Sequence, residues 1–202
     1  MKHIIFGILL FVSIVSVYLI FFSGTSIVNY PTKSGSIIAF GDSLVAGVGA
    51  KYNEDFVSLL SLKIGEPILN FGIAGNTTQD GLLRVDAMLE EKPRIVILLL
   101  GGNDFIRKIP KQETFSNLKQ LIVKIQKSGA VVVLLGVRGG VLVDGYNSDF
   151  KTLSKETGSV YVEDVLDGIF GKTALMNDSV HPNNEGYKII AEKVYQEMKS
   201  VL

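Results

Sequence analysis

The chain has 202 residues, 47% of them hydrophobic, which suits one folded domain with a sizeable core. Its 20 basic and 20 acidic residues balance, so no excess of positive charge indicates nucleic acid as a partner. The absence of cysteine excludes disulfides, a thiol nucleophile, cysteine-ligated zinc and a lipidated N-terminal cysteine.

The first predicted element is an uncharged apolar segment of 19 residues, 4–22. As a helix it would span roughly 28 Å, close to the hydrocarbon thickness of a bilayer. Lys2 is the only Lys or Arg before Lys33, a bias that places the N-terminus in the cytoplasm. We therefore predict that residues 1–22 form an N-terminal membrane anchor and that the folded domain lies outside the cytoplasm.

A cleaved signal peptide is the alternative, and it would give a secreted or periplasmic protein. Secretory apolar regions usually have about 7 to 15 residues and end in an Ala-x-Ala-like site. Here only residues 23–26 supply small side chains. A buried soluble helix is disfavoured because the segment has no polar face. Residues 23–35, small and polar with one proline, are typical of a linker, and residues 36–202 form the predicted domain.

Short β-rich runs alternate with stretches of helical periodicity throughout that domain. The predicted strands are 37–40, 67–71, 94–100, 130–135 and 160–162. Two of them, 94–100 and 130–135, are apolar nearly throughout, as expected of parallel strands covered on both faces. The pattern predicts an α/β fold in which helices cover both faces of a five-stranded parallel sheet, in three layers.

Two of the predicted helices have clear apolar stripes. One precedes Gly129, a typical helix stop, and carries Phe115, Leu118, Ile122 and Ile125. The last helix has Asn183 or Asn184 available as its N-cap. Its stripe consists of Tyr187, Ile190, Ala191, Val194, Met198 and Val201.

Polar and glycine-rich segments follow the first three predicted strands. They are Gly41-Asp42-Ser43, Gly72-Ile73-Ala74-Gly75-Asn76 and Gly101-Gly102-Asn103-Asp104. In open α/β sheets, ligands bind beyond the carboxyl ends of the strands. We therefore expect these three segments to meet at one rim of the sheet and to form the functional site.

Ser43 is the candidate nucleophile, although Gly, Asp and Ser are also ordinary strand-to-helix connectors. Serine needs a base, and His181 is the one histidine outside the N-terminal segment, because the other is His3. Asp178 lies three residues before His181. Across a tight turn, its carboxylate can accept from Nδ1 while Nε2 faces Ser43. The competing interpretation of His181 is a surface loop residue beside a helix cap.

An oxyanion intermediate needs two or three converging hydrogen-bond donors. The candidates are the backbone N–H groups of Ser43 and Gly75 and the side-chain amide of Asn103. Turn formation is the competing explanation for Gly75 and Asn103. We expect no metal, because one histidine with scattered carboxylates lacks the ligand cluster of a zinc site.

The segments that contain Ser43, Gly75, Asn103 and His181 follow one another along the chain and resemble the GDSL-type SGNH hydrolases. This family is named after the serine, glycine, asparagine and histidine of four separate blocks. Here these are Ser43, Gly75, Asn103 and His181, and the resemblance covers residues 36–202. It implies a flavodoxin-like SGNH fold, a Ser43–His181–Asp178 triad, and hydrolysis of esters or thioesters of small-molecule or lipid acyl groups. It also implies no metal or organic cofactor.

Within the family, the chain is similar to the bacterial acyl-CoA thioesterase I, lysophospholipase L1 and arylesterase branch. The similarity lies in residues 70–75 followed by Thr77, and in Tyr146-Asn147. Asn76 is a departure, because that branch often has aspartate there. The predicted membrane span is a second departure, because soluble secreted forms are familiar in the branch.

The substrate pocket and two rival functions complete the predictions. An apolar loop, Val141-Leu142-Val143, together with Phe105 and Ile106, is predicted to line an acyl-chain groove, although core packing explains these residues as well. A carbohydrate O-acetyl esterase acting on cell-wall polymer would use the same triad. A nucleotide-binding module is disfavoured, because Gly47-Val48-Gly49-Ala50 lacks the remainder of a phosphate-loop motif.

Overall fold

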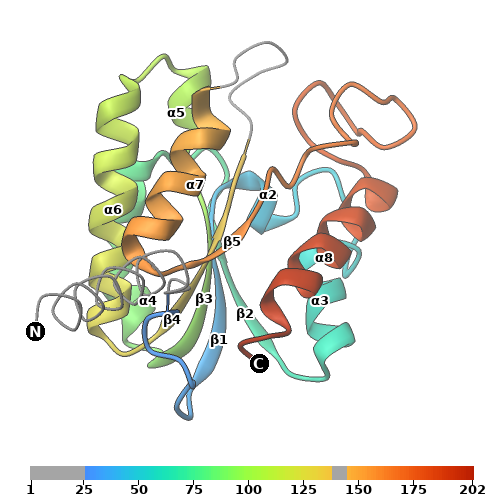
Figure 1. The fold of residues 1–202 in the computed structure, drawn as a ribbon. Helices are drawn as coiled ribbons and strands as arrows, with labels where there is room; N and C mark the ends of the chain where they lie inside the picture. Colours follow the sequence, from blue (N-terminus) through green and yellow to red (C-terminus); the bar gives the residue numbers. More distant parts are fainter. Residues whose placement is uncertain (1–25, 138–144) are drawn as a thin grey trace, which may run out of the picture.

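The computed structural model describes residues 26–137 and 145–202, which form a three-layer α/β/α domain (Figure 1). Five parallel strands make one sheet in the order β2-β1-β3-β4-β5. The strands are β1 (Ser36–Gly41), β2 (Ile68–Gly72), β3 (Pro93–Leu99), β4 (Val131–Leu135) and β5 (Val160–Val162). The predicted five-stranded parallel sheet is confirmed, and every predicted strand boundary is within one residue of the observed one.

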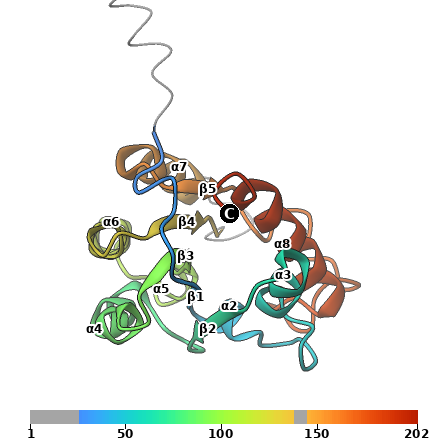
Figure 2. The ribbon, with the colours of Figure 1, turned by 90° about the horizontal axis from the view of Figure 1, so that it is seen from below.

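Helices cover both faces of the sheet (Figure 2). One face carries α2 (Ser43–Ala46), α3 (Phe56–Ile64) and α8 (Asn184–Met198). The other carries α4 (Thr78–Leu89), α5 (Gly102–Ile106), α6 (Lys111–Lys127) and α7 (Gly145–Thr157). β3 and β4 are buried along most of their length, which explains their continuous apolar sequences.

Local signals in the sequence fix the ends of the longer helices. Asn183 caps α8 by accepting from the N–H groups of Glu185 and Gly186, as predicted. The predicted apolar stripe of α8 was wrong at its last member, because the helix ends at Met198; Val201 lies beyond it and is buried nonetheless. α6 ends at Lys127, two residues before Gly129, whose φ of +95° cannot continue a helix.

The sheet order places a change of direction at β1. The chain leaves β1 for β2 on one side and then returns to β3 on the other side. At such a switch point the loops after adjacent strands diverge and leave a crevice at the carboxyl rim. The loops after β1, β2 and β3 do lie at this rim, as expected.

The described chain begins at the opposite end of the sheet (Figure 1). There the Val28 N–H donates to the Gly158 carbonyl at 3.0 Å. The Asn29 amide donates to the carbonyls of Gln126 and Ala130 at 2.7 and 2.9 Å. Residues 26–30 are therefore attached near the amino ends of β4 and β5.

The predicted membrane segment, residues 4–22, lies outside the described residues. Within residues 26–137 and 145–202, no helix combines the length and apolar character needed to cross a membrane.

Candidate active site

Ser43 begins α2, the short helix directly after β1. The Asp42 side chain caps this helix by accepting from the Leu44 N–H at 3.0 Å. The helix packs closely on β2, because a Cβ at Gly72 would lie 2.2 Å from the Ala46 nitrogen. Asn70 strengthens this contact by donating to the Val45 carbonyl at 2.7 Å. These contacts hold Ser43 at the carboxyl rim, where its residue is 9% exposed.

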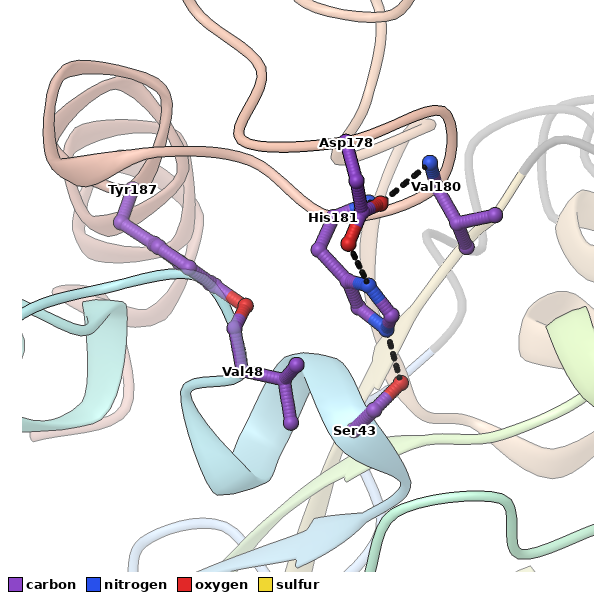
Figure 3. Close-up of polar contacts among 6 residues, drawn as sticks. All are labelled: Ser43, Val48, Asp178, Val180, His181 and Tyr187. Atoms are coloured by element: carbon purple, nitrogen blue, oxygen red, sulfur yellow. Dashed lines mark hydrogen bonds and ion pairs between the residues drawn. The ribbon is translucent and has the colours of Figure 1, made fainter.

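His181 lies between Asp178 and Ser43 (Figure 3). Its Nε2 atom is 3.0 Å from the Ser43 hydroxyl, and its Nδ1 atom is 2.9 Å from Asp178 Oδ2. With the ring proton on Nδ1, the imidazole donates to the carboxylate and Nε2 can accept from the serine hydroxyl. The structure thus brings together the three side chains that the sequence singled out, across 138 residues of chain.

The loop around His181 is ordered by the same carboxylate. Asp178 Oδ1 accepts from the N–H groups of Val180 and His181 at 2.7 and 2.8 Å. The hydrogen bond from the His181 ring, followed by these backbone bonds, holds the pKa of Asp178 well below its usual range. Asp178 is therefore a carboxylate, not an acid, throughout the neutral range.

The turn after α2 is attached to the loop of His181. The Tyr187 hydroxyl of α8 donates to the Val48 carbonyl at 2.8 Å (Figure 3). A Cβ at Gly49 would lie 2.5 Å from the Pro182 carbonyl oxygen. These contacts explain the glycine-rich segment 47–50 as a packed turn.

The three predicted oxyanion donors come from the segments that follow β1, β2 and β3: Ser43 from α2, Gly75 from a turn and Asn103 from α5. Gly75 has a φ of +82°, a left-handed conformation that favours glycine, in the turn closed by Asn76 N–H donating to the Ile73 carbonyl. The Asn103 amide donates to the Asn76 carbonyl at 3.0 Å and to Asp42 Oδ2 at 3.4 Å. Within the described ranges, the N–H groups of Ser43 and Gly75 donate to no protein acceptor.

Asp104, next to Asn103, is fully buried, and no role was predicted for it from the sequence. Its carboxylate accepts from the Thr78 N–H at 2.9 Å and from the Thr78 hydroxyl at 2.5 Å. Asn117 of α6 also donates to that hydroxyl, at 3.2 Å. The short helix α5 is in this way joined to the start of α4.

A mainly apolar cavity of about 150 Å³ adjoins Ser43 and Asn103. Of the residues predicted to line a substrate groove, Phe105 and Ile106 line this cavity, and Val141, Leu142 and Val143 lie outside the described residues. Its other apolar lining residues were not predicted, because they come from four separate segments with no common pattern. These are Leu44, Val137, Leu166, Phe170 and Val180.

Across residues 26–137 and 145–202, no three His, Cys, Asp or Glu side chains are grouped to hold a metal ion. The prediction that the protein needs no cofactor stays a prediction.

Comparisons with known proteins found a family match and several relatives. Residues 39–189 match the GDSL-like Lipase/Acylhydrolase family. The chain is 28% identical to "Esterase TesA" of Pseudomonas aeruginosa over 179 residues, which cover 83% of this chain and 89% of that protein. It is 32% identical to "Arylesterase" of Vibrio mimicus over 177 residues, 82% of this chain and 88% of that protein.

A third relative and a solved structure extend the comparison. "Thioesterase 1/protease 1/lysophospholipase L1" of Escherichia coli is 27% identical over 176 residues, 83% of this chain and 85% of that protein. The crystal structure of TesA superposes with a TM-score of 0.78 at 28% identity and covers 83% of this chain and 99% of that chain.

Proposed function

The chain belongs to the GDSL-like lipase/acylhydrolase family of esterases and thioesterases, and we therefore propose that it hydrolyses acyl esters or thioesters with Ser43 as nucleophile. The observation that carries the proposal is the chain of contacts from Asp178 through His181 to Ser43. A weakly nucleophilic hydroxyl, a base within hydrogen-bond reach and a carboxylate that orients the base are the parts this reaction needs.

In the first half of the reaction, Ser43 Oγ attacks the acyl carbonyl carbon while His181 Nε2 takes the serine proton. Asp178 stabilises the imidazolium that forms. The carbonyl oxygen becomes an oxyanion, which accepts from the N–H groups of Ser43 and Gly75 and from the Asn103 amide. To do so, the Asn103 amide would give up its hydrogen bond to Asp42, which at 3.4 Å is the longer of the two bonds that it donates. Collapse of this intermediate expels the alcohol or thiol, which receives its proton from His181.

In the second half, water resolves the acyl-enzyme. His181 removes a proton from the water as its oxygen attacks the acyl carbon, and the same donors stabilise the second oxyanion. The bond from the acyl carbon to Ser43 Oγ then breaks, and the serine recovers its proton from His181. The products are a carboxylic acid and the free enzyme.

The apolar cavity beside Ser43 supports an acyl chain as the group that is transferred. Its volume of about 150 Å³ is smaller than the roughly 300–1,000 Å³ of pockets for drug-sized ligands, so it suits one chain more than a whole lipid. Phe105 and Phe170 flank this cavity. We therefore propose acyl esters of small molecules or lipids, or acyl thioesters, as the substrate class. The apolar loop Val141-Leu142-Val143, predicted from the sequence, belongs to the same proposed groove.

One panel of assays tests the proposal. The full chain and Ser43→Ala are compared on p-nitrophenyl esters of increasing acyl length and on acyl-CoA. We expect the wild-type chain to hydrolyse these substrates and Ser43→Ala to be inactive. Phe170→Ala should change the preferred acyl-chain length more than it changes the rate on the acetate ester. Activity on the acetyl ester alone, with none on the longer acyl esters or on acyl-CoA, would favour the O-acetyl esterase instead. Equal hydrolysis by both proteins would eliminate the mechanism.

We also propose that residues 1–22 anchor the enzyme in a membrane, with residues 36–202 as the catalytic domain outside the cytoplasm. The uncharged segment 4–22 supports the anchor, and Lys2 supports the orientation. Cleavage of the segment would instead release a secreted or periplasmic enzyme. The mass of the mature protein distinguishes these outcomes.

A further inference from the structure

Arg84, in the middle of α4, joins three segments of the proposed site. Its Nη2 atom donates to the Gly41 carbonyl at 2.6 Å, and its Nη1 atom donates to the Phe71 carbonyl at 2.8 Å. Its Nε atom donates to Asn76 Oδ1 at 2.6 Å. The guanidinium also lies over the Phe40 ring, 4.0 Å from the ring centroid. Every nitrogen of this side chain is therefore directed at a different acceptor.

The first acceptor belongs to the segment of the proposed nucleophile. Gly41 ends β1 two residues before Ser43, and its carbonyl also accepts from the Ile73 N–H at 3.0 Å. Ile73 opens the turn that contains Gly75. At this carbonyl, Arg84 thus joins the strand that leads to Ser43 and the turn that carries Gly75.

The third acceptor, on Asn76, lies directly after Gly75, one of the proposed oxyanion donors. Arg84 donates to the side chain of Asn76, while the backbone carbonyl of Asn76 accepts from the Asn103 amide at 3.0 Å. The preceding carbonyl, that of Gly75, accepts from Arg107 at 2.7 Å. A displacement of Asn76 would therefore move Gly75 and release Asn103 together.

We propose that Arg84 is a positioning residue for the oxyanion site, holding the Gly75 N–H and the Asn103 amide at a fixed distance from Ser43. This inference rests on the proposed function. The planar fork of an arginine reaches three acceptors in fixed directions, which the single ammonium group of a lysine cannot do. A displacement of about 1 Å in such donors can cost about 10²-fold in rate.

The test separates positioning from general stability by kinetics on a p-nitrophenyl ester. We expect Arg84→Met in the full chain to lower kcat by about 10- to 100-fold and to leave KM within about threefold, because the donors act mainly on the transition state. The affinity for a boronic acid, which forms a tetrahedral adduct on serine, should fall in parallel with kcat/KM. Arg84→Lys should restore little of the loss, because it restores the charge but not the fork.

Arg94→Met is the matched control. Arg94 is also an arginine with a largely buried side chain, 11% exposed, and it pairs with Glu66 at 2.7 Å. It lies near the amino end of β3, at the opposite end of the sheet from Ser43. We expect kcat of this variant to equal that of the wild type.

Asn76→Ala provides a second test, which does not disturb the contacts of Arg84 with the two strands. We expect kcat to fall in this variant as well. The double variant with Arg84→Met should have a kcat little lower than that of the more impaired single variant, because both substitutions break the same link. If Arg84→Met does not fold, Asn76→Ala alone decides the question.

Two results would overturn the positioning proposal, and a third would overturn the proposed function. If kcat in Arg84→Met and Asn76→Ala stays within twofold of the wild type while Ser43→Ala is inactive, the positioning proposal is wrong and the proposed function stands. Full recovery of kcat in Arg84→Lys would also overturn the proposal, since charge alone would then suffice. If Ser43→Ala retains activity, the proposed function itself fails.

Discussion

Asp42 is a buried carboxyl group directly before Ser43, and its residue is 3% exposed. Burial raises its pKa to about 7, and the hydrogen bond from the Leu44 N–H opposes this shift. An acid with a raised pKa keeps its proton in the folded state at pH values where the unfolded chain has lost it. The contribution of Asp42 to the free energy of unfolding therefore falls as the pH rises from about 4 to about 7.

We expect Asp42→Asn to raise the melting temperature relative to wild type, and by more at pH 8 than at pH 4. The amide cannot ionise, and its oxygen still accepts from the Leu44 N–H. Thermal unfolding at the two pH values measures the difference, and Asp86→Asn, which alters an exposed carboxylate, is the control. The same shift at both pH values would contradict the raised pKa of Asp42.

Asn103 is the side-chain donor of the proposed oxyanion site. We expect Asn103→Ala to lower kcat by about 10²- to 10³-fold with little change in KM, because the amide would act on the transition state. Steady-state kinetics on a p-nitrophenyl ester measures this, with the exposed amide Gln120→Ala as control. Normal turnover in Asn103→Ala would remove this residue from the mechanism.

At this scale the sequence predicted the residues with distinctive chemistry but not those that support them. His181 was identifiable because it is the one histidine outside the N-terminal segment, and Asp178 because it lies three residues before His181. Ser43 was identifiable because it lies in the polar segment that follows the first strand. Arg84 carried no such signal, since two of its acceptors are backbone carbonyls 43 and 13 residues distant. Any residue type can supply a carbonyl, so no sequence pattern marks this contact.

At the scale of elements, α2 and α8 are joined by Tyr187. Its residue is fully buried, and its hydroxyl donates to Val48 in the turn after α2. Removing the hydroxyl leaves the Val48 carbonyl without this donor, which typically costs about 1–3 kcal/mol. Because α2 carries Ser43 and the loop before α8 carries His181, loss of this bond should also loosen the contact between them.

We therefore expect Tyr187→Phe to lower both the free energy of unfolding and kcat, the latter by less than about tenfold. Urea unfolding and ester hydrolysis measure the two effects. Tyr195→Phe is the matched control, because it removes a tyrosine hydroxyl from the same helix, where the ring faces Lys63. If the two variants have the same kcat, the bond to Val48 does not support the site.

The sequence predicted the strands more completely than the helices of the site. Buried parallel strands are continuous apolar runs between polar loops, so their boundaries were predicted to within one residue. The helices α2 and α5 have four and five residues, too few to show a helical period. They form where the loops after β1 and β3 fold against neighbouring segments, which local sequence does not specify.

At the scale of the molecule, the described chain begins at the end of the sheet opposite Ser43. Asn29 fixes this start near the amino ends of β4 and β5, and β1, with six residues, spans roughly 20 Å between the two ends. If residues 4–22 form the proposed anchor, few residues separate it from this attachment. We therefore predict that the catalytic rim faces away from the enzyme's own bilayer.

This orientation predicts which substrates the full chain reaches in reconstituted vesicles. We expect hydrolysis of a water-soluble p-nitrophenyl ester but little hydrolysis of an acyl ester embedded in the same bilayer. A flexible Gly/Ser insertion of about 20 residues between Thr25 and Ser26 should raise the second rate and leave the first unchanged. Efficient hydrolysis of the embedded ester without the insertion would contradict the predicted orientation.

Covalent labelling can identify the nucleophile directly. The full chain is treated with a p-nitrophenyl phosphonate, which mimics the tetrahedral intermediate, and the adduct is located by mass spectrometry of peptides. We expect one adduct, on Ser43, with loss of esterase activity in proportion to labelling and no adduct in Ser43→Ala. An adduct on another residue that accounts for the loss of activity, or wild-type hydrolysis by Ser43→Ala, would contradict it.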